Sequence, residues 1–136
     1  EGPEDYLVYG IDEEYLRKNP KLYQHTLESY RESIKGSDIL IFQAHPFRKG
    51  LKVADPKLLD GVEIMNGNPR HDSHNDLAFD FALKHGLMMI AGSDAHRPED
   101  VGRGGIRICS GISSSIELAS WMKKNSSLDL YIPELI

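Results

Sequence analysis

Asp94 and His96 lie two positions apart, shortly after the apolar run 87–91. Along an extended backbone, residues i and i+2 point to the same face, about 6.6 Å apart at a rise of about 3.3 Å per residue. The spacing therefore predicts that both side chains reach one point beyond the end of a strand. Gly92 precedes them and leaves room for a ligand or metal to approach closely. Because α/β enzymes carry their chemistry at the carboxyl ends of buried strands, Asp94 and His96 are the candidate catalytic residues.

His45 occupies a comparable position, after the apolar run 39–42 and before Pro46. Considered alone, it is typical of a histidine in a turn. Together with Asp94 and His96, it gives a set of nitrogen and oxygen donors of the types that divalent metals use. We therefore predict that these three residues are metal ligands.

Glu63 lies in the run 61–67, which is typical of a strand followed by a turn. Two interpretations of this carboxylate stay open. It orders His45 or Asn66 from behind, as the outer partners of metal ligands do, or it is a surface or buried paired carboxylate with no such role.

Arg48, Arg97 and Arg103 are candidates for binding an anionic substrate, and Arg70 is a further one. Guanidinium groups bind phosphate oxygens through paired hydrogen bonds, and the glycine-rich run 102–105 exposes backbone amides beside one of them. For any one of these arginines, a solvated loop position is the simpler interpretation.

The elements that position these residues alternate between apolar runs of strand length and segments of helical periodicity. Strands are predicted at 6–9, 39–42, 61–66, 87–91, 106–109 and 128–132, and helices at 11–18, 20–34, 73–85 and 113–124. This alternation predicts βαβ units and a largely parallel sheet. The strand-end residues brought to one face of such a sheet are His45, Asn66, Asp94 and His96.

Helix boundaries follow from local capping residues. Asn19 with Pro20 is a favourable start for the helix at 20–34. Asp72 or Ser73 can cap the next helix, and Gly86 can end it.

Composition limits the class of protein. The chain has 136 residues, 40% of them hydrophobic and 27% charged, which predicts one globular domain over residues 1–136. No run approaches a membrane span, and no signal-peptide pattern opens the chain. The net charge of −5 argues against a nucleic-acid surface. Cys109 is alone and has no base partner, so we expect a buried structural thiol and a cytoplasmic location.

Three segments resemble the polymerase and histidinol phosphatase (PHP) family. They are Ile-Phe-Gln-Ala-His-Pro at 41–46, Asp-Gly-Val-Glu-Ile-Met-Asn-Gly at 60–67, and Gly-Ser-Asp-Ala-His at 92–96, with Asp-Val-Gly at 100–102 behind them. The resemblance runs from about Tyr6 to about Lys124 and covers the C-terminal part of the family's domain. It implies an α/β fold in which parallel strands form the C-terminal portion of a distorted (βα)7 barrel, and a chain that is part of a longer protein.

The resemblance also implies a metal site. Family members hold up to three divalent ions (Zn, Mn, Fe or Mg) at the carboxyl ends of the strands, and His45, Asp94 and His96 match the late ligands. A further family histidine falls near Asp5, which would replace it as an oxygen ligand. The family's opening His-x-His motif is absent from this chain.

The implied function is that of a parent metal-dependent phosphoesterase, which hydrolyses a small phosphorylated substrate with metal-activated water. This chain carries only the late ligands, so we expect it to be inactive alone. Barrel strands without their neighbours expose an open edge, which favours a homo-oligomer. Two alternatives stay open: a non-catalytic scaffold or assembly fragment, and a metal-dependent hydrolase that acts on C–N bonds.

Overall fold

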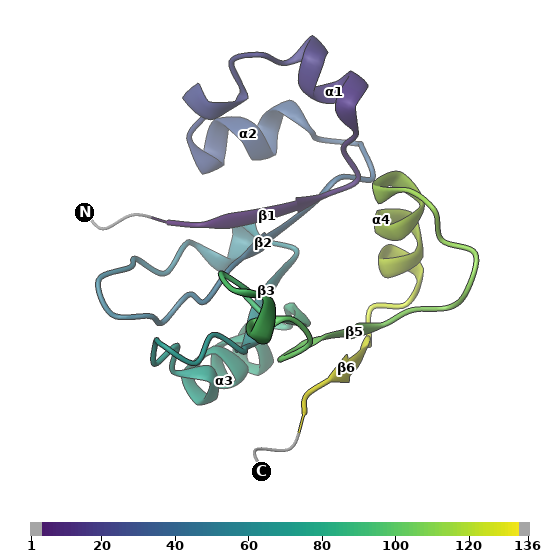
Figure 1. Cartoon of the computed structure of the whole chain (residues 1–136). Coiled ribbons are helices and arrows are strands. Elements are labelled where there is room, and N and C mark those ends of the chain that lie inside the picture. The colour runs from purple at the N-terminus through teal and green to yellow at the C-terminus, as the bar shows by residue number, and fades with distance from the viewer. Residues whose placement is uncertain (1–3, 134–136) are drawn as a thin grey trace.

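The computed structural model describes residues 4–133, in which strands and helices alternate along the chain (Figure 1). The strands are β1 (Tyr6–Tyr9), β2 (Leu40–Gln43), β3 (Gly61–Asn66), β4 (Met88–Gly92), β5 (Gly105–Arg107) and β6 (Asp129–Tyr131). The α-helices are α1 (Glu13–Lys18), α2 (Leu27–Ser33), α3 (Asn75–His85) and α4 (Ser115–Lys124), and the 3-10 turns are η1 (Leu22–Gln24), η2 (Pro56–Leu58) and η3 (Pro98–Asp100).

The main sheet has four strands in the order β1-β2-β3-β4. β2, β3 and β4 are parallel, which confirms the prediction of an α/β fold with a mostly parallel sheet. β1 differs, because it runs antiparallel to β2 with Tyr6 opposite Gln43. The alternation of strands and helices in the sequence indicates how many strands the chain contains, but it does not indicate the direction in which each strand runs. Within residues 4–133 the sheet does not close into a barrel, and β5 and β6 form a separate antiparallel pair.

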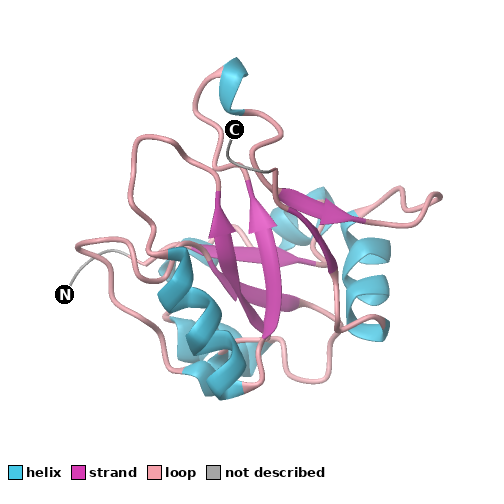
Figure 2. Ribbon diagram, turned by 90° about the horizontal axis from the view of Figure 1, so that it is seen from below, coloured by secondary structure: helices cyan, strands magenta, loops and turns pink. Residues whose placement is uncertain are grey.

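Helices lie on both sides of the strands, so the sheet has a core on each face (Figure 2). Ile41 belongs to one core, together with residues of α2 and α3. Leu40 and Phe42 belong to the other, against Ala119 and Met122 of α4. This division follows from the alternation of side chains along a strand. All four residues of β2 are buried, as its uninterrupted apolar run predicts.

The helix predicted at 20–34 is wrong in its first half. The chain makes the short turn η1, becomes extended at His25, and begins α2 only after Thr26. The Thr26 side chain accepts a hydrogen bond from the backbone N–H of Ser29 at 3.1 Å. This local cap satisfies a free helix N–H and competes with the start at Pro20.

The start predicted for α3 also differs from the structure. Neither Asp72 nor Ser73 is its cap, because His74 precedes the first helical residue in a left-handed conformation and makes no side-chain cap. Gly86 ends the helix in the left-handed conformation at φ 63°, as predicted.

Cys109 is exposed, so the prediction of a buried thiol is wrong. β5 ends at Arg107, which leaves Cys109 in the loop that follows the strand. In the described part of the chain, no helix combines the length and the apolar character needed to cross a bilayer.

Candidate functional site

Candidate site residues gather where the parallel strands end. His45 follows β2, Asn66 closes β3, and Asp94 follows β4. Because β1 is antiparallel, its amino end lies beside the carboxyl end of β2, where the N–H of Ala44 donates to the carbonyl of Asp5 at 2.9 Å. The antiparallel direction of β1, which was not predicted, therefore brings Asp5, the residue just before this strand, to the site.

A hollow of about 360 Å³ is formed at this edge of the sheet. Its lining residues are Asp5, Leu7, Ala44, His45, Glu63, Asn66, Gly92 and Asp94. Three of the four predicted metal ligands thus share one space, and only His96 lies outside it.

His45 is buried at the side of this hollow, with 7% of its surface exposed. Its Nε2 lies 3.6 Å from the Asp5 Oδ2, while its buried Nδ1 has no hydrogen-bond partner. Burial, together with the positive charge of Arg48, lowers the pKa of His45. The imidazole is therefore held towards its neutral form, which is the form that binds metals.

Asp94 points its carboxylate towards polar donors. Its Oδ2 accepts hydrogen bonds from the Arg48 Nη2 at 2.8 Å and from the Asn68 Nδ2 at 3.2 Å. Burial acts to raise the pKa of Asp94, but the hydrogen bonds from Arg48 and Asn68 outweigh it and hold this pKa below its ordinary value. Asp94 is therefore a carboxylate at neutral pH.

His96 does not extend from the strand beside Asp94. Asp94 has a positive φ of 46°, so the extended geometry assumed for residues 94–96 is not formed. The His96 side chain is 66% exposed, against 21% for that of Asp94. Its Nδ1 lies 2.9 Å from the Asp94 carbonyl oxygen and 3.7 Å from the Asp94 Oδ1. The structure keeps the two residues adjacent while turning the imidazole towards solvent.

Glu63 contacts both residues named in the first of its two interpretations, and its role towards a metal stays a prediction. Its Oε2 accepts hydrogen bonds from the backbone N–H of His45 at 3.0 Å and from the Asn66 Nδ2 at 2.9 Å. Burial raises the pKa of Glu63, although these two hydrogen bonds act in the opposite direction. A Cβ on Gly92 would lie 2.6 Å from the Glu63 Oε1. The close approach that Gly92 permits is therefore that of this carboxylate.

Asp100 was given no role from the sequence, although it begins the Asp-Val-Gly run at 100–102 that resembles the PHP family. It is fully buried and accepts hydrogen bonds from the backbone N–H groups of His96 and Arg97, each at 3.0 Å. Its carboxylate is also ion-paired to Arg70. The Arg70 hydrogen bond, with those backbone donors, holds the pKa of Asp100 far below its ordinary value. Arg70 therefore fixes the loop after Asp94.

We expect Asp100→Asn to lower the melting temperature by roughly 5–10 °C at pH 7, because it leaves Arg70 without its partner. The pKa of Asp100 is depressed in the folded state, so its stabilisation is complete above the unfolded pKa of about 3.9. It is lost as the pH falls below that value towards the folded pKa. The gap in melting temperature between the two proteins should therefore stay constant from pH 7 to about pH 4 and begin to narrow below it, and a gap that is unchanged at pH 3 would contradict this assignment.

The arginines proposed for anion binding separate into two groups. Arg48 lies in the site, where its side chain is mostly buried. Arg97 and Arg103 are exposed in the loop after Asp94. The Arg103 backbone packs on Gly67, where a Cβ would lie 2.4 Å from its carbonyl oxygen. The structure thus places Arg48 against the Asp94 carboxylate, whereas Arg97 and Arg103 stay in the exposed loop that follows Asp94.

A family model described as PHP-associated (PHP_C) matches residues 72–124. The chain contains a PHP-associated C-terminal segment. This match confirms the resemblance over residues 72–124, which include the Gly-Ser-Asp-Ala-His run at 92–96. Asp94, His96 and Asp100 lie inside the PHP-associated segment, whereas Asp5 and His45 precede it.

One solved structure with the same fold is that of PsfC from Pseudomonas syringae PB-5123. It is 17% identical in sequence and superposes with a TM-score of 0.69 over 98% of this chain. The chain spans 59% of the length of PsfC, and at this level of identity the likeness concerns the fold alone. A comparison with curated proteins gave no match.

The donor types around the PHP-associated segment suit a divalent metal, but their arrangement does not complete a site. The unpartnered Nδ1 of His45 and the carboxylates of Asp5 and Asp94 are suitable donors. Across residues 4–133, however, no group of three or more His, Cys, Asp and Glu side chains is placed to hold an ion. The Asp94 Oδ2 is instead bonded to Arg48.

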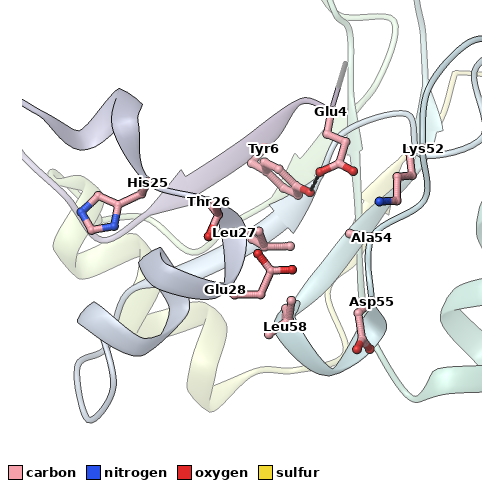
Figure 3. Close-up of a pocket in the computed structure, with 10 residues that line it drawn as sticks. All are labelled: Glu4, Tyr6, His25, Thr26, Leu27, Glu28, Lys52, Ala54, Asp55 and Leu58. Atoms are coloured by element: carbon pink, nitrogen blue, oxygen red, sulfur yellow. Dashed lines mark hydrogen bonds between the residues drawn. The ribbon is translucent and has the colours of Figure 1, made fainter. Parts of the chain in front are cut away.

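A larger cavity of about 680 Å³ lies elsewhere, between the start of β1, the start of α2 and the segment around η2 (Figure 3). It is lined by carboxylates (Glu4, Glu28 and Asp55), Lys52, and polar and apolar side chains that include Tyr6, Thr26, Leu27 and Leu58. Tyr6 donates a hydrogen bond to Glu4, and burial together with that bond raises the pKa of Tyr6. No predicted site residue lines this cavity.

Proposed function

We propose that this chain is the C-terminal part of a PHP-type metal-dependent phosphoesterase that hydrolyses the phosphate ester of a small substrate. The observation that carries the proposal is the shared hollow lined by Asp5, His45 and Asp94 at the ends of parallel strands. Such strand ends are where α/β enzymes bind substrates. The PHP-associated match at residues 72–124 supports the same family of activities.

Each residue has a role in this proposal. Asp5, His45, Asp94 and His96 are donors to the metal site, which residues outside this chain complete. A divalent metal bound there would polarise a phosphate oxygen and lower the pKa of a bound water. The neutral His45 and ionised Asp94 are already in the protonation states that such donors need. Arg48, Arg97 and Arg103 orient the phosphate through charge-assisted hydrogen bonds.

The proposal also includes the setting of the site. We propose that the distorted barrel of the family is completed by the rest of the parent protein, in line with the 59% of PsfC that this chain spans. An unpaired sheet edge in the chain alone would favour self-association. The substrate is a small phosphorylated molecule rather than a nucleic acid, because the net charge of −5 disfavours a polyanion.

Metal removal from the full-length protein tests this function. Dialysis against a chelator should abolish hydrolysis of p-nitrophenyl phosphate, and added Mn²⁺ or Zn²⁺ should restore it. Elemental analysis before and after dialysis gives the metal content. Hydrolysis that continues unchanged in the metal-free protein would refute the proposed mechanism.

A second candidate is a non-catalytic scaffold, favoured by the 2.8 Å contact between Arg48 and Asp94. That contact gives the carboxylate a partner within the chain. A folded full-length protein that contains no metal and hydrolyses neither phosphate esters nor amides would support the scaffold. Hydrolysis of amides or amidines alone would instead indicate a C–N hydrolase with the same donors.

A further inference from the structure

Arg48 occupies the position at Asp94 that a cation would take. Its Nη2 donates to the Asp94 Oδ2 at 2.8 Å, to the Asn66 Oδ1 at 3.0 Å and to the Ser73 Oγ at 3.0 Å. Its Nε lies 3.3 Å from the same Ser73 Oγ. These acceptors come from three separate segments of the chain, so the guanidinium is held in one place rather than lying along the surface.

The contact is sheltered from water. The Arg48 side chain is 15% exposed and that of Asp94 is 21% exposed. Asn66 and Ser73 are both buried. A charge-assisted hydrogen bond in such surroundings is stronger than an ion pair at the surface, because solvent screens it less. An incoming ion must therefore displace a well-held partner.

Arg48 already pairs a positive charge with Asp94, so a divalent ion at Asp94 would bring a second positive charge close to the first. Three carboxylates, Asp5, Glu63 and Asp94, line the hollow. Glu63 accepts its two hydrogen bonds from neutral donors, and Asp5 lies 3.6 Å from the His45 Nε2, whereas Asp94 accepts a hydrogen bond from the charged Arg48. A divalent ion at Asp94 would meet the guanidinium at close range, where like charges repel strongly.

We propose that Arg48 is a resident cation that competes with a divalent metal for the Asp94 carboxylate and so sets the metal affinity of this site. The inference rests on the metal donors of the proposed function but concerns their regulation. Metal enters only as the guanidinium moves from the carboxylate. The released Arg48 then keeps its hydrogen bonds to Asn66 and Ser73 or binds an anion. Coupling of this kind is reciprocal, so an anion that binds Arg48 raises the affinity for metal.

Mn²⁺ titration by calorimetry tests the competition, with Mn²⁺ chosen because it prefers oxygen and nitrogen donors to the exposed Cys109 thiol. Arg48→Gln removes the charge and should tighten Mn²⁺ binding by about tenfold or more, as expected for a unit charge about 5 Å from a divalent ion. Arg48→Lys keeps the charge but has a shorter side chain and lacks the Nε that contacts Ser73, so its Mn²⁺ affinity should lie between those of Arg48→Gln and the unmodified protein. If Arg48→Gln fails to fold, Arg48→Lys alone decides the question.

Arg31→Gln is the matched control. Arg31 forms a comparable, partly buried ion pair with Asp60, with 2.8 Å between the Arg31 Nη2 and the Asp60 Oδ2, and neither residue lines the hollow. The substitution should leave Mn²⁺ affinity unchanged. Folded Arg48 variants that bind Mn²⁺ no tighter than the unmodified protein would overturn the competition, while metal binding by all of them would leave the proposed function standing. Tighter binding by Arg48→Gln without any phosphatase activity in the full-length protein would support the competition and refute the proposed function.

Discussion

Asp94→Ala should reduce hydrolysis of p-nitrophenyl phosphate by the full-length protein by at least about a hundredfold in kcat/KM. The change removes the carboxylate that lines the hollow with Asp5 and His45. A bound metal supplies several kcal/mol of transition-state stabilisation, and each 1.4 kcal/mol or so corresponds to a tenfold change in rate. Steady-state kinetics with saturating Mn²⁺ measure the effect.

Asp94→Ala also removes the partner of Arg48, so a loss of folding must be separated from a loss of function. Asp94→Asn keeps the size of the side chain and should be equally inactive while retaining a native circular dichroism spectrum. Asp129→Ala is the matched control, because Asp129 forms an exposed pair with Arg107 at 3.3 Å. Full activity in a folded Asp94→Ala protein would rule out the proposed role of this carboxylate.

Gly61→Ala should lower the free energy of unfolding by about 3 kcal/mol or more. A Cβ at this position would lie 2.2 Å from the Phe42 Cε1 and 2.4 Å from the Met88 backbone oxygen. Phe42 is fully buried, and the oxygen belongs to the neighbouring strand β4, so neither can move without disturbing the sheet. Overpacking of a core usually costs about 1–3 kcal/mol, and a rigid backbone atom places this case at the upper end or beyond it.

Urea unfolding followed by the fluorescence of Trp121 measures the loss for Gly61→Ala. Gly105→Ala is the matched control, since Gly105 also lies in a strand but a Cβ there meets nothing within 4 Å. Its unfolding midpoint should stay close to that of the unmodified protein. Equal midpoints for the two variants would show that the strands separate at Gly61 at little energetic cost.

The parts of the fold that were predicted from the sequence depend on local patterns. The run of β2 is uninterrupted and apolar because both of its faces are covered, and Gly86 ends α3 because a left-handed residue is needed there. The ordering role of Glu63 was one of two open interpretations, because its place in a strand was readable but the face on which it lies and its partners were not. His45 and Asp94 were predicted at strand ends because each shortly follows an apolar run of strand length.

The parts that were not predicted depend on contacts between distant segments. The direction of β1 is decided by its pairing with β2, some thirty residues later, and nothing in its own residues indicates it. The same holds for the bond between Arg48 and Asp94, and for the burial of Asp100 under the loop that it holds. The His96 side chain does not point where the sequence predicted, because Asp94 leaves the extended conformation. The periodicity of a strand does not indicate such a local change.

The left-handed backbone at His45 and Asp94 limits which amino acids can replace them during evolution. Their φ angles are 30° and 46°, a region that β-branched and bulky residues avoid and that Asn, Asp, His and Gly enter at least cost. Apart from glycine, the tolerated types all carry oxygen or nitrogen lone pairs. Selection for folding alone would therefore tend to retain polar, ligand-capable side chains at these two positions, even in a lineage that had abandoned catalysis.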